Sequence, residues 1–448
     1  MFPYIPHTEE DIHQMLEKMG MNELEDLFAD IPRELRLNRE LNLEPPKSEM
    51  EVGQVLSDLA CQNKTTSELV CFMGAGIYDH YIPSIVKHIT SRSEFYTAYT
   101  PYQAEISQGT LQVIFEFQTM IANLTGMDIS NASMYDGSTA TAEAAAIAAS
   151  QTRRKQVLVS STVHPETRQV LETYARFNGI QMATIPALNG ATDLDQMKSM
   201  VSKDTAAVIL QNPNFFGIIE EVEEAEKAIH EVKGLLILSV DPISLGILKA
   251  PGDLGADIVV GEGQAMGNAM SYGGPHVGFM AATSKLMRKM PGRIAGQTTD
   301  VDGNIGYVLT LQTREQHIRR EKATSNICSN QALNALAALV YMSILGKKGI
   351  QEVARQSYRK AHYALEKIQA VEGYSLAYQK PFFKEFLVRT RRTPQTVNES
   401  LLEKGILGGY PVKKHYPDLA DSLLFCVTEK RSLDEIHRLV EGLEVAKG

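Results

Sequence analysis

Between residues 157 and 240 the chain alternates short apolar runs with longer segments whose apolar positions recur at helical spacing. Strands that alternate with helices need right-handed crossovers, which place helices on both faces of a mostly parallel sheet. The pattern therefore predicts an α/β fold. The predicted strands are 157–160, 180–185, 206–210 and 235–240, and the predicted helices are 164–177, 193–201 and 220–232.

Two further apolar runs, 257–260 and 277–281, enclose a glycine-rich segment and predict two more buried parallel strands. Ligands of such sheets bind at the carboxyl ends of the strands, and Asp241 directly follows the strand 235–240. Fold-type-I pyridoxal-phosphate enzymes use an aspartate in this position to keep the pyridinium nitrogen of the cofactor protonated. Asp241 is therefore a candidate cofactor-binding residue.

The lysine that should accompany such an aspartate is missing. In those enzymes the Schiff-base lysine follows about two dozen residues later, but no Lys or Arg occurs from Ala250 to Ser284. Gln264 stands 23 residues after Asp241, where the lysine is expected. A simpler interpretation, in which Asp241 caps a loop and the glycines form turns, stays open on this motif alone.

Two further positions could contact a cofactor. Gly137, Ser138 and Thr139 lead into the alanine-rich helix 144–149, and backbone N–H groups at a helix N-terminus can bind phosphate. The alternative is that Ser138 or Thr139 only caps the helix. His164 follows the strand 157–160 and could stack on a flat ring, although surface histidines near helix starts are commoner.

Five tyrosines, Tyr78, Tyr81, Tyr96, Tyr99 and Tyr102, lie within one short stretch of the chain. Tyrosine combines an apolar ring with a polar hydroxyl and is enriched at interfaces. Because Pro101 interrupts regular structure, this stretch is predicted to be a loop that lines a subunit interface or a ligand pocket. A buried loop whose hydroxyls bond to the backbone is the alternative.

The two ends of the chain have separate patterns. Thr8 and Asp11 resemble a capping box before a short helix that should end at Gly20. After residue 325, a helix at 331–345 and strands at 386–388 and 423–427 suit a small α/β domain. The predicted division is an N-terminal helical arm, 1–70, a large domain, 71–325, and a small C-terminal domain, 326–448.

Composition narrows the possible partners and location. The formal net charge of -10 argues against nucleic acid or an anionic membrane surface. No apolar run approaches a membrane span and the N-terminus does not resemble a secretory signal, so a cytoplasmic protein is expected. The four scattered cysteines are predicted to be reduced thiols, with no metal site. A basic cluster at 313–325 predicts a charged helix face or an anion-binding surface.

Several stretches together resemble the glycine cleavage system P-protein, glycine dehydrogenase (decarboxylating). The resemblance covers nearly the whole chain and is greatest to the family's separately encoded N-terminal-half type, subunit 1 or alpha. The stretches are TAYTPYQAEISQGTLQ (97–112), NASMYDGSTATAEAA (131–145), GADIVVGEGQAMGNAMSYGGPHVGF (255–279) and TREQHIRREKATSNIC (313–328).

The resemblance implies a fold-type-I large domain and an activity shared between two subunits. The P-protein uses pyridoxal phosphate to decarboxylate glycine and passes the aminomethyl group to the lipoyl group of the H-protein. In split forms the second subunit (beta) carries the Schiff-base lysine and binds the cofactor covalently, with which Gln264 agrees. By analogy this chain alone would be inactive, and its remaining pocket would be vestigial. The vestigial residues would be Ser138, Thr139, His164, Asp241 and Gln264.

Because active sites of this fold lie at subunit interfaces, the resemblance also makes the loop from Tyr96 to Glu105, called the tyrosine loop below, a candidate contributor to the partner's site. Its candidate residues are Tyr96, Tyr99, Thr100, Tyr102 and Glu105. Two alternatives remain: a self-sufficient pyridoxal-phosphate enzyme whose lysine lies elsewhere, and a scaffold subunit that supplies no active-site group.

Overall fold

The structure, a computed structural model, describes residues 4–323, 325–327 and 329–446. Residues 1–64 and 65–448 form two separate compact units. The first unit contains α1 (Glu9–Met19) and α2 (Glu49–Ala60) with short 3-10 turns between them. Thr8 caps α1 as predicted, since its hydroxyl accepts from the Asp11 N–H and the Asp11 carboxylate accepts from the Thr8 N–H. Gly20, in the left-handed conformation at φ 72°, ends the helix.

A seven-stranded sheet forms the body of the second unit, with strand order β2-β10-β9-β8-β7-β3-β4. The strands β9, β8, β7, β3 and β4 are parallel, which confirms the mostly parallel α/β fold. The bounds are β2 Ile129–Ser130, β3 Gln156–Ser160, β4 Gln181–Ile185, β7 Thr205–Asn212, β8 Leu235–Val240, β9 Ile258–Glu262 and β10 Gly278–Ala282.

The prediction that the apolar run 277–281 forms a parallel strand is wrong. This run becomes β10, which lies antiparallel to both β9 and β2. The described connection from β9 to β10 contains only the 3-10 turn Ser271–Gly273, and a parallel pairing would need a crossover, usually a helix. The chain therefore returns beside β9 in the opposite direction.

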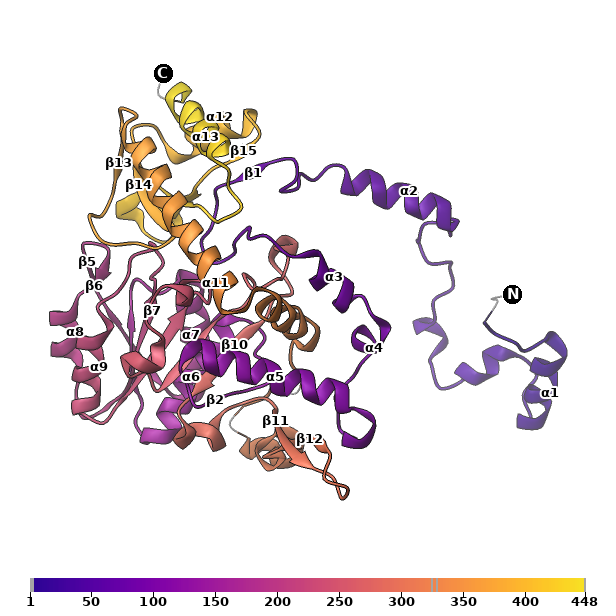
Figure 1. The fold of residues 1–448 in the computed structure, drawn as a ribbon. Helices are drawn as coiled ribbons and strands as arrows, with labels where there is room; N and C mark the ends of the chain where they lie inside the picture. Colours follow the sequence, from indigo (N-terminus) through magenta and orange to yellow (C-terminus); the bar gives the residue numbers. More distant parts are fainter. Residues whose placement is uncertain (1–3, 324, 328, 447–448) are drawn as a thin grey trace. The chain divides into compact units, whose positions relative to one another are not determined.

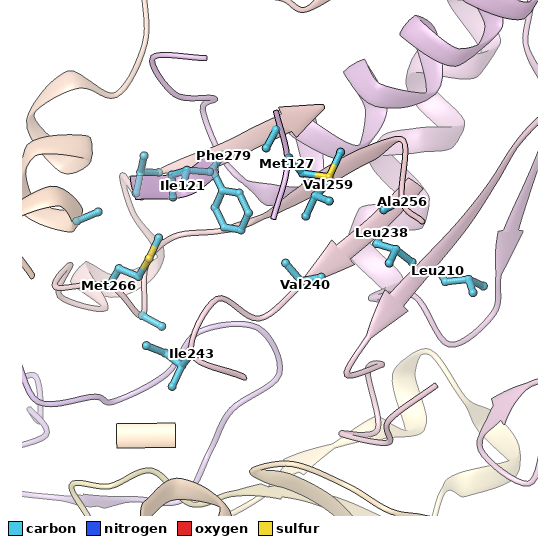
Figure 2. Packing of buried hydrophobic residues seen from close by; sticks show 14 of the residues in the cluster. Ile121, Met127, Leu210, Leu238, Val240, Ile243, Ala256, Val259, Met266 and Phe279 are labelled. Atoms are coloured by element: carbon cyan, nitrogen blue, oxygen red, sulfur yellow. The ribbon is translucent and has the colours of Figure 1, made fainter. Parts of the chain in front are cut away.

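The strands of the sheet carry apolar side chains on both faces, so helices cover both faces. Leu210, Leu238 and Val259 pack with Ile121 and Phe279 on one face, as Figure 2 shows. Val159, Ile209 and Ile237 belong to a second cluster on the other face, with α6 and α7. The helices are α5 Gln108–Thr125, α6 Gly137–Thr152, α7 Pro165–Asn178, α8 Leu194–Met200 and α9 Val222–Glu231.

The C-terminal part has its own four-stranded antiparallel sheet, order β13-β14-β17-β16, with its own apolar core. In Figure 1 its elements gather at the opposite end of the second unit from the hairpin β11–β12. The bounds are β13 Tyr374–Leu376, β14 Glu385–Thr390, β16 Tyr410–Pro411, β17 Ser422–Cys426, α12 Pro394–Glu403, α13 Leu433–Val445, β11 Ile294–Thr299 and β12 Ile305–Thr310.

One long helix, α11 (Ala332–Gln369), connects the two sheets. The predicted helix 331–345 covers only its first part, which packs in the core of the large sheet, whereas residues near Ala361 pack in the C-terminal core. Gly346, at φ 57° and ψ -171°, interrupts the helix between these two parts. The three-domain division at residues 70 and 325 stays a prediction.

The remaining elements are short. They are α3 Ser84–Thr90, α4 Ser93–Tyr96, α10 Gln316–Arg319, and the two-stranded pairs β1 (Val70–Cys71) with β15 (Ile406–Leu407) and β5 (Ala187–Leu188) with β6 (Ala191–Thr192). Among the described residues, none of the helices is long and apolar enough to cross a membrane. Cys61, Cys71 and Cys426 form no disulfide, and Cys328 lies outside the described residues. The described residues also contain no group of three or more His, Cys, Asp or Glu placed to hold a metal ion.

Candidate functional site

Asp241 follows β8 as predicted, but a lysine from the C-terminal part already pairs with its carboxylate. The Nζ atom of Lys384 lies 2.8 Å from Oδ2 of Asp241, and the Lys384 side chain is only 1% exposed. The other carboxylate oxygen, Oδ1, accepts from the backbone N–H of Ile243 at 3.0 Å. The ammonium group of Lys384 therefore makes the contact that a protonated pyridinium nitrogen makes in fold-type-I enzymes.

Two further groups contact the Lys384 ammonium, and a third orients one of them. Its Nζ lies 2.9 Å from Nε2 of His80 and 3.5 Å from the centre of the Tyr78 ring, a cation–π contact. Nδ1 of His80 lies 2.5 Å from Oε2 of Glu429. Burial and the neighbouring Lys384 lower the pKa of His80, so its neutral ring accepts from Lys384 and donates to Glu429. The Nζ atom of Lys384 is therefore fully engaged by protein groups.

Gln264, in the place of the Schiff-base lysine, is 2% exposed and bonds to the backbone. Its Oε1 accepts from the Tyr78 N–H at 2.9 Å, and its Nε2 donates to the carbonyl oxygens of Tyr78 and Asn268 at 3.0 and 2.8 Å. The amide thus fastens the segment around Tyr78 to the end of β9. A lysine ammonium could not accept from the Tyr78 N–H, so this arrangement specifically suits an amide.

The N-terminus of α6, predicted to bind phosphate or to be capped by Ser138 or Thr139, is occupied by carboxylates. Asp136 is the N-cap, and its Oδ1 accepts from the Thr139 N–H at 2.7 Å. Oε2 of Glu262 accepts from the Gly137 N–H at 3.0 Å. The Ser138 hydroxyl bonds to Thr167 at 2.9 Å. Burial raises the pKa of Glu262 to about 7. A phosphate placed here would have to displace both carboxyl groups from the N–H groups that they occupy.

His164 lies at the carboxyl end of β3 as predicted, but it contacts protein groups. Its Nε2 lies 2.9 Å from the Ala75 carbonyl oxygen, and its backbone N–H donates to Oε1 of Gln211 at 2.8 Å. Its ring meets the Phe215 ring edge-on, with centroids 5.1 Å apart. Burial lowers the pKa of His164, so its ring is neutral near pH 7.

Several of these residues surround one cavity of about 420 Å³. Ser138, His164 and Asp241 line it together with Lys384 and Glu262, whereas Thr139 and Gln264 are not among its lining residues. The residues present do not fit pyridoxal phosphate, because Gln264 cannot form the Schiff base, Lys384 already pairs with the ring-nitrogen carboxylate, and Glu262 occupies the phosphate position. We call this set of residues the self-paired pocket.

The tyrosine loop lines a second cavity, of about 240 Å³. Tyr96, Tyr99 and Thr100 line it. Tyr102 lies outside the lining, although its ring centre is 5.7 Å from the guanidinium carbon of Arg293, and Glu105 is exposed in the 3-10 turn Ala104–Ile106. The side chains of Tyr99 and Tyr96 are 80% and 57% exposed. The structure thus brings three of the five candidate residues to one cavity.

Sequence reasoning missed Lys384 and Glu262, which decide the character of the self-paired pocket. Lys384 lies 143 residues beyond Asp241, immediately before β14, and no local motif marks it. Glu262 ends β9 two residues before Gln264, within a glycine-rich segment. Glu262 lies 125 residues beyond Gly137 in the sequence, so no local pattern linked its carboxyl group to the predicted phosphate site.

The fold first defines the class of protein. The chain is similar to a glutamate decarboxylase of Lactobacillus brevis at TM-score 0.70 and 13% identity, covering 92% of this chain and 95% of that one. At this identity the likeness concerns the fold alone, and the fold is that of fold-type-I pyridoxal-phosphate enzymes.

The family follows from much closer matches. The model of the glycine cleavage system P-protein family matches residues 3–443. A probable glycine dehydrogenase (decarboxylating) subunit 1 from Carboxydothermus hydrogenoformans is 56% identical over 440 residues, which are 98% of this chain and 99% of that protein. The crystal structure of an inhibitor-bound glycine decarboxylase (P-protein) of the glycine cleavage system has TM-score 0.91 and 43% identity, covering 99% and 100% of the two chains. The chain belongs to the glycine cleavage system P-protein family.

Proposed function

We propose that this chain is the non-lysine-bearing subunit 1 of a two-subunit glycine dehydrogenase (decarboxylating). The name of the relative from Carboxydothermus hydrogenoformans, which aligns over nearly its whole length, supports a partner subunit 2. Pyridoxal phosphate is held by that lysine-bearing partner and not by this chain. The observation that carries this assignment is the Lys384–Asp241 pair at 2.8 Å, together with Gln264 in place of the lysine.

The assembled enzyme would bind glycine, release carbon dioxide and pass the aminomethyl group to the lipoyl group of the H-protein, in the cytoplasm. The role of this chain would be to complete its partner's site with the tyrosine loop. Tyr96, Tyr99 and Thr100 share one cavity, and exposed tyrosine side chains such as Tyr99 suit an interface. The remaining loop candidates, Tyr102 and Glu105, are both exposed as well.

The self-paired pocket would have a structural role. Lys384 precedes β14 of the C-terminal sheet, whereas Asp241 follows β8 of the large sheet, so their ion pair connects the two sheets. The Lys384–Asp241 ion pair would thus occupy the position that the cofactor ring takes in fold-type-I enzymes. The chain would be inactive alone because Lys384, the single lysine among the described residues that line the pocket, is already bound by Asp241 and His80.

Glycine–bicarbonate exchange tests this proposal. The lysine-bearing subunit should be purified with and without this chain and assayed in the presence of H-protein and pyridoxal phosphate. We expect exchange only when both subunits are present, and none from this chain alone. Exchange by the lysine-bearing subunit at an undiminished rate without this chain would contradict the proposal, as would exchange by this chain alone.

A further inference from the structure

The cavity beneath the tyrosine loop contains a buried arginine, two of whose guanidinium nitrogens have no hydrogen-bond partner among the described residues. Arg293 precedes β11, is 3% exposed and is one of the residues that line the cavity. Neither its Nε nor its Nη2 has a hydrogen-bond partner in the described part of the chain. Arginine keeps its charge at any ordinary pH, and a buried charge left unpaired is strongly unfavourable.

The surroundings of Arg293 provide no counter-charge. Of the described residues that line the cavity, Arg293 is the single charged one, among apolar side chains such as Phe117 and Leu336. The Tyr102 ring gives a cation–π contact at 5.7 Å, which does not satisfy N–H donors. Arg314, which follows β12, differs because both of its Nη atoms donate, to the carbonyl oxygens of Met290 and Gly292, and only its Nε is unpaired among the described residues.

We propose that this cavity is a carboxylate-binding site with Arg293 as the residue that binds the anion. One cation in a wall of otherwise uncharged residues favours a singly charged group over a phosphate dianion, and a guanidinium fits a carboxylate with two parallel hydrogen bonds. The hydroxyls of Tyr96, Tyr99 and Thr100 are candidates for further donors, because these residues also line the cavity.

The carboxylate could belong to a small-molecule substrate or to an acidic side chain of the partner subunit. Both sources share the same chemistry, and the cavity of about 240 Å³ is large enough for a group of either kind. The substrate case rests on the proposed function, in which this loop completes the partner's site and glycine supplies the carboxylate. Direct binding of acetate, measured without any assay of activity, separates the carboxylate site from that function.

The first experiment titrates acetate into the full chain, with chloride as the reference salt, by isothermal titration calorimetry. We expect one acetate per chain for the wild type and for the control Arg314→Met. Arg293→Met should weaken binding about tenfold to a hundredfold, the loss expected when a charge-assisted hydrogen bond is removed. Arg293→Lys keeps the charge without the planar donor pair and should lie between, which also provides a test if Arg293→Met fails to fold.

The second experiment uses the complex with the lysine-bearing subunit to decide whether the bound carboxylate belongs to the substrate or to the partner subunit. A substrate carboxylate predicts that Arg293→Met raises the glycine concentration for half-maximal exchange at least tenfold while assembly is unchanged. A partner carboxylate predicts weaker assembly by sedimentation, and loss of acetate binding by the wild-type chain once it is assembled. The proposal is overturned if the wild-type chain binds no acetate and Arg293→Met, correctly folded, changes neither glycine dependence nor assembly.

Discussion

The ammonium of Lys384 and the carboxylate of Asp241, 2.8 Å apart and both largely buried, connect the C-terminal sheet to the end of β8. Family membership and fold class alone would assign Asp241 to a cofactor ring. Lys384 of the same chain gives Asp241 a different role. The Asp241 oxygen that binds the Lys384 ammonium cannot also bind the ring nitrogen of a cofactor. The self-paired pocket therefore differs from a cofactor pocket in two ways: it lacks the Schiff-base lysine, and it contains the Lys384–Asp241 ion pair.

Removing Lys384 should destabilise the folded chain, because the change leaves Asp241 as a buried carboxylate without its counter-charge. We expect Lys384→Met to lower the free energy of unfolding by about 3–5 kcal/mol in urea titrations. The double variant Lys384→Met/Asp241→Asn removes both charges and should recover most of that loss. A cost below about 1 kcal/mol for Lys384→Met would show that the pair contributes little to joining the sheets.

Restoring the missing lysine should not restore cofactor binding. Gln264→Lys breaks the bonds to the Tyr78 backbone and leaves Lys384 on Asp241 and Glu262 at the Gly137 N–H. After incubation with pyridoxal phosphate and borohydride reduction, we expect mass spectrometry to find no adduct at position 264. Stoichiometric labelling of that lysine would mean that Lys384 and Glu262 do not block the pocket.

Stability should depend on pH through Glu385, which is buried beside the pocket. Its carboxylate accepts from the Ala75 N–H and the Tyr78 hydroxyl, yet burial outweighs both and raises the pKa of Glu385 to about 7. The folded state therefore keeps a proton that the unfolded chain, with a carboxyl pKa of 4.5, has lost. Stability from this group is fully present below pH 4.5 and decreases as the pH rises towards about 7.

Glu385→Gln removes this titration while the amide oxygen can still accept a hydrogen bond. The slope of unfolding free energy against pH in that window should become shallower by up to about 1.4 kcal/mol per pH unit. Glu223→Gln is the matched control, because Glu223 is exposed and its hydrogen bond to Lys249 lowers its pKa. An unchanged slope for Glu385→Gln in urea titrations would contradict the assignment.

The tyrosine loop should matter to the complex more than to the fold. Tyr99→Phe removes one hydroxyl from a side chain that is 80% exposed, so the isolated chain should unfold as the wild type does. In the assembled enzyme we expect glycine–bicarbonate exchange to fall about threefold to tenfold, as for one lost hydrogen bond. Glu105→Ala should lower exchange as well, with assembly intact.

Tyr81→Phe is the control for the loop, because Tyr81 is 62% exposed and does not line the cavity. This variant should leave exchange unchanged. Wild-type rates for Tyr99→Phe and Glu105→Ala would remove the support for a loop that completes the partner's site.

Sequence patterns predicted the large sheet well because its strands are buried on both faces and its helices have clear apolar periods. Residues 235–240 form β8 with the predicted ends, and Asp241 and His164 lie at strand ends as expected. The predicted direction of β10 was wrong because an apolar run looks the same whether the chain enters it through a crossover, as a parallel strand, or through a short connection, as an antiparallel strand. Lys384 and Arg293 could not be predicted, since their importance comes from distant neighbours and from a missing partner, which no local pattern records.

The most direct test of the account is the location of pyridoxal phosphate in the assembled two-subunit enzyme. The complex should be reduced with borohydride and digested, and the phosphopyridoxyl peptides of both subunits should be identified by mass spectrometry. The account predicts one modified lysine in the partner subunit and no modification of this chain. A phosphopyridoxyl group on Lys384, or on any other lysine of this chain at comparable occupancy, would contradict it.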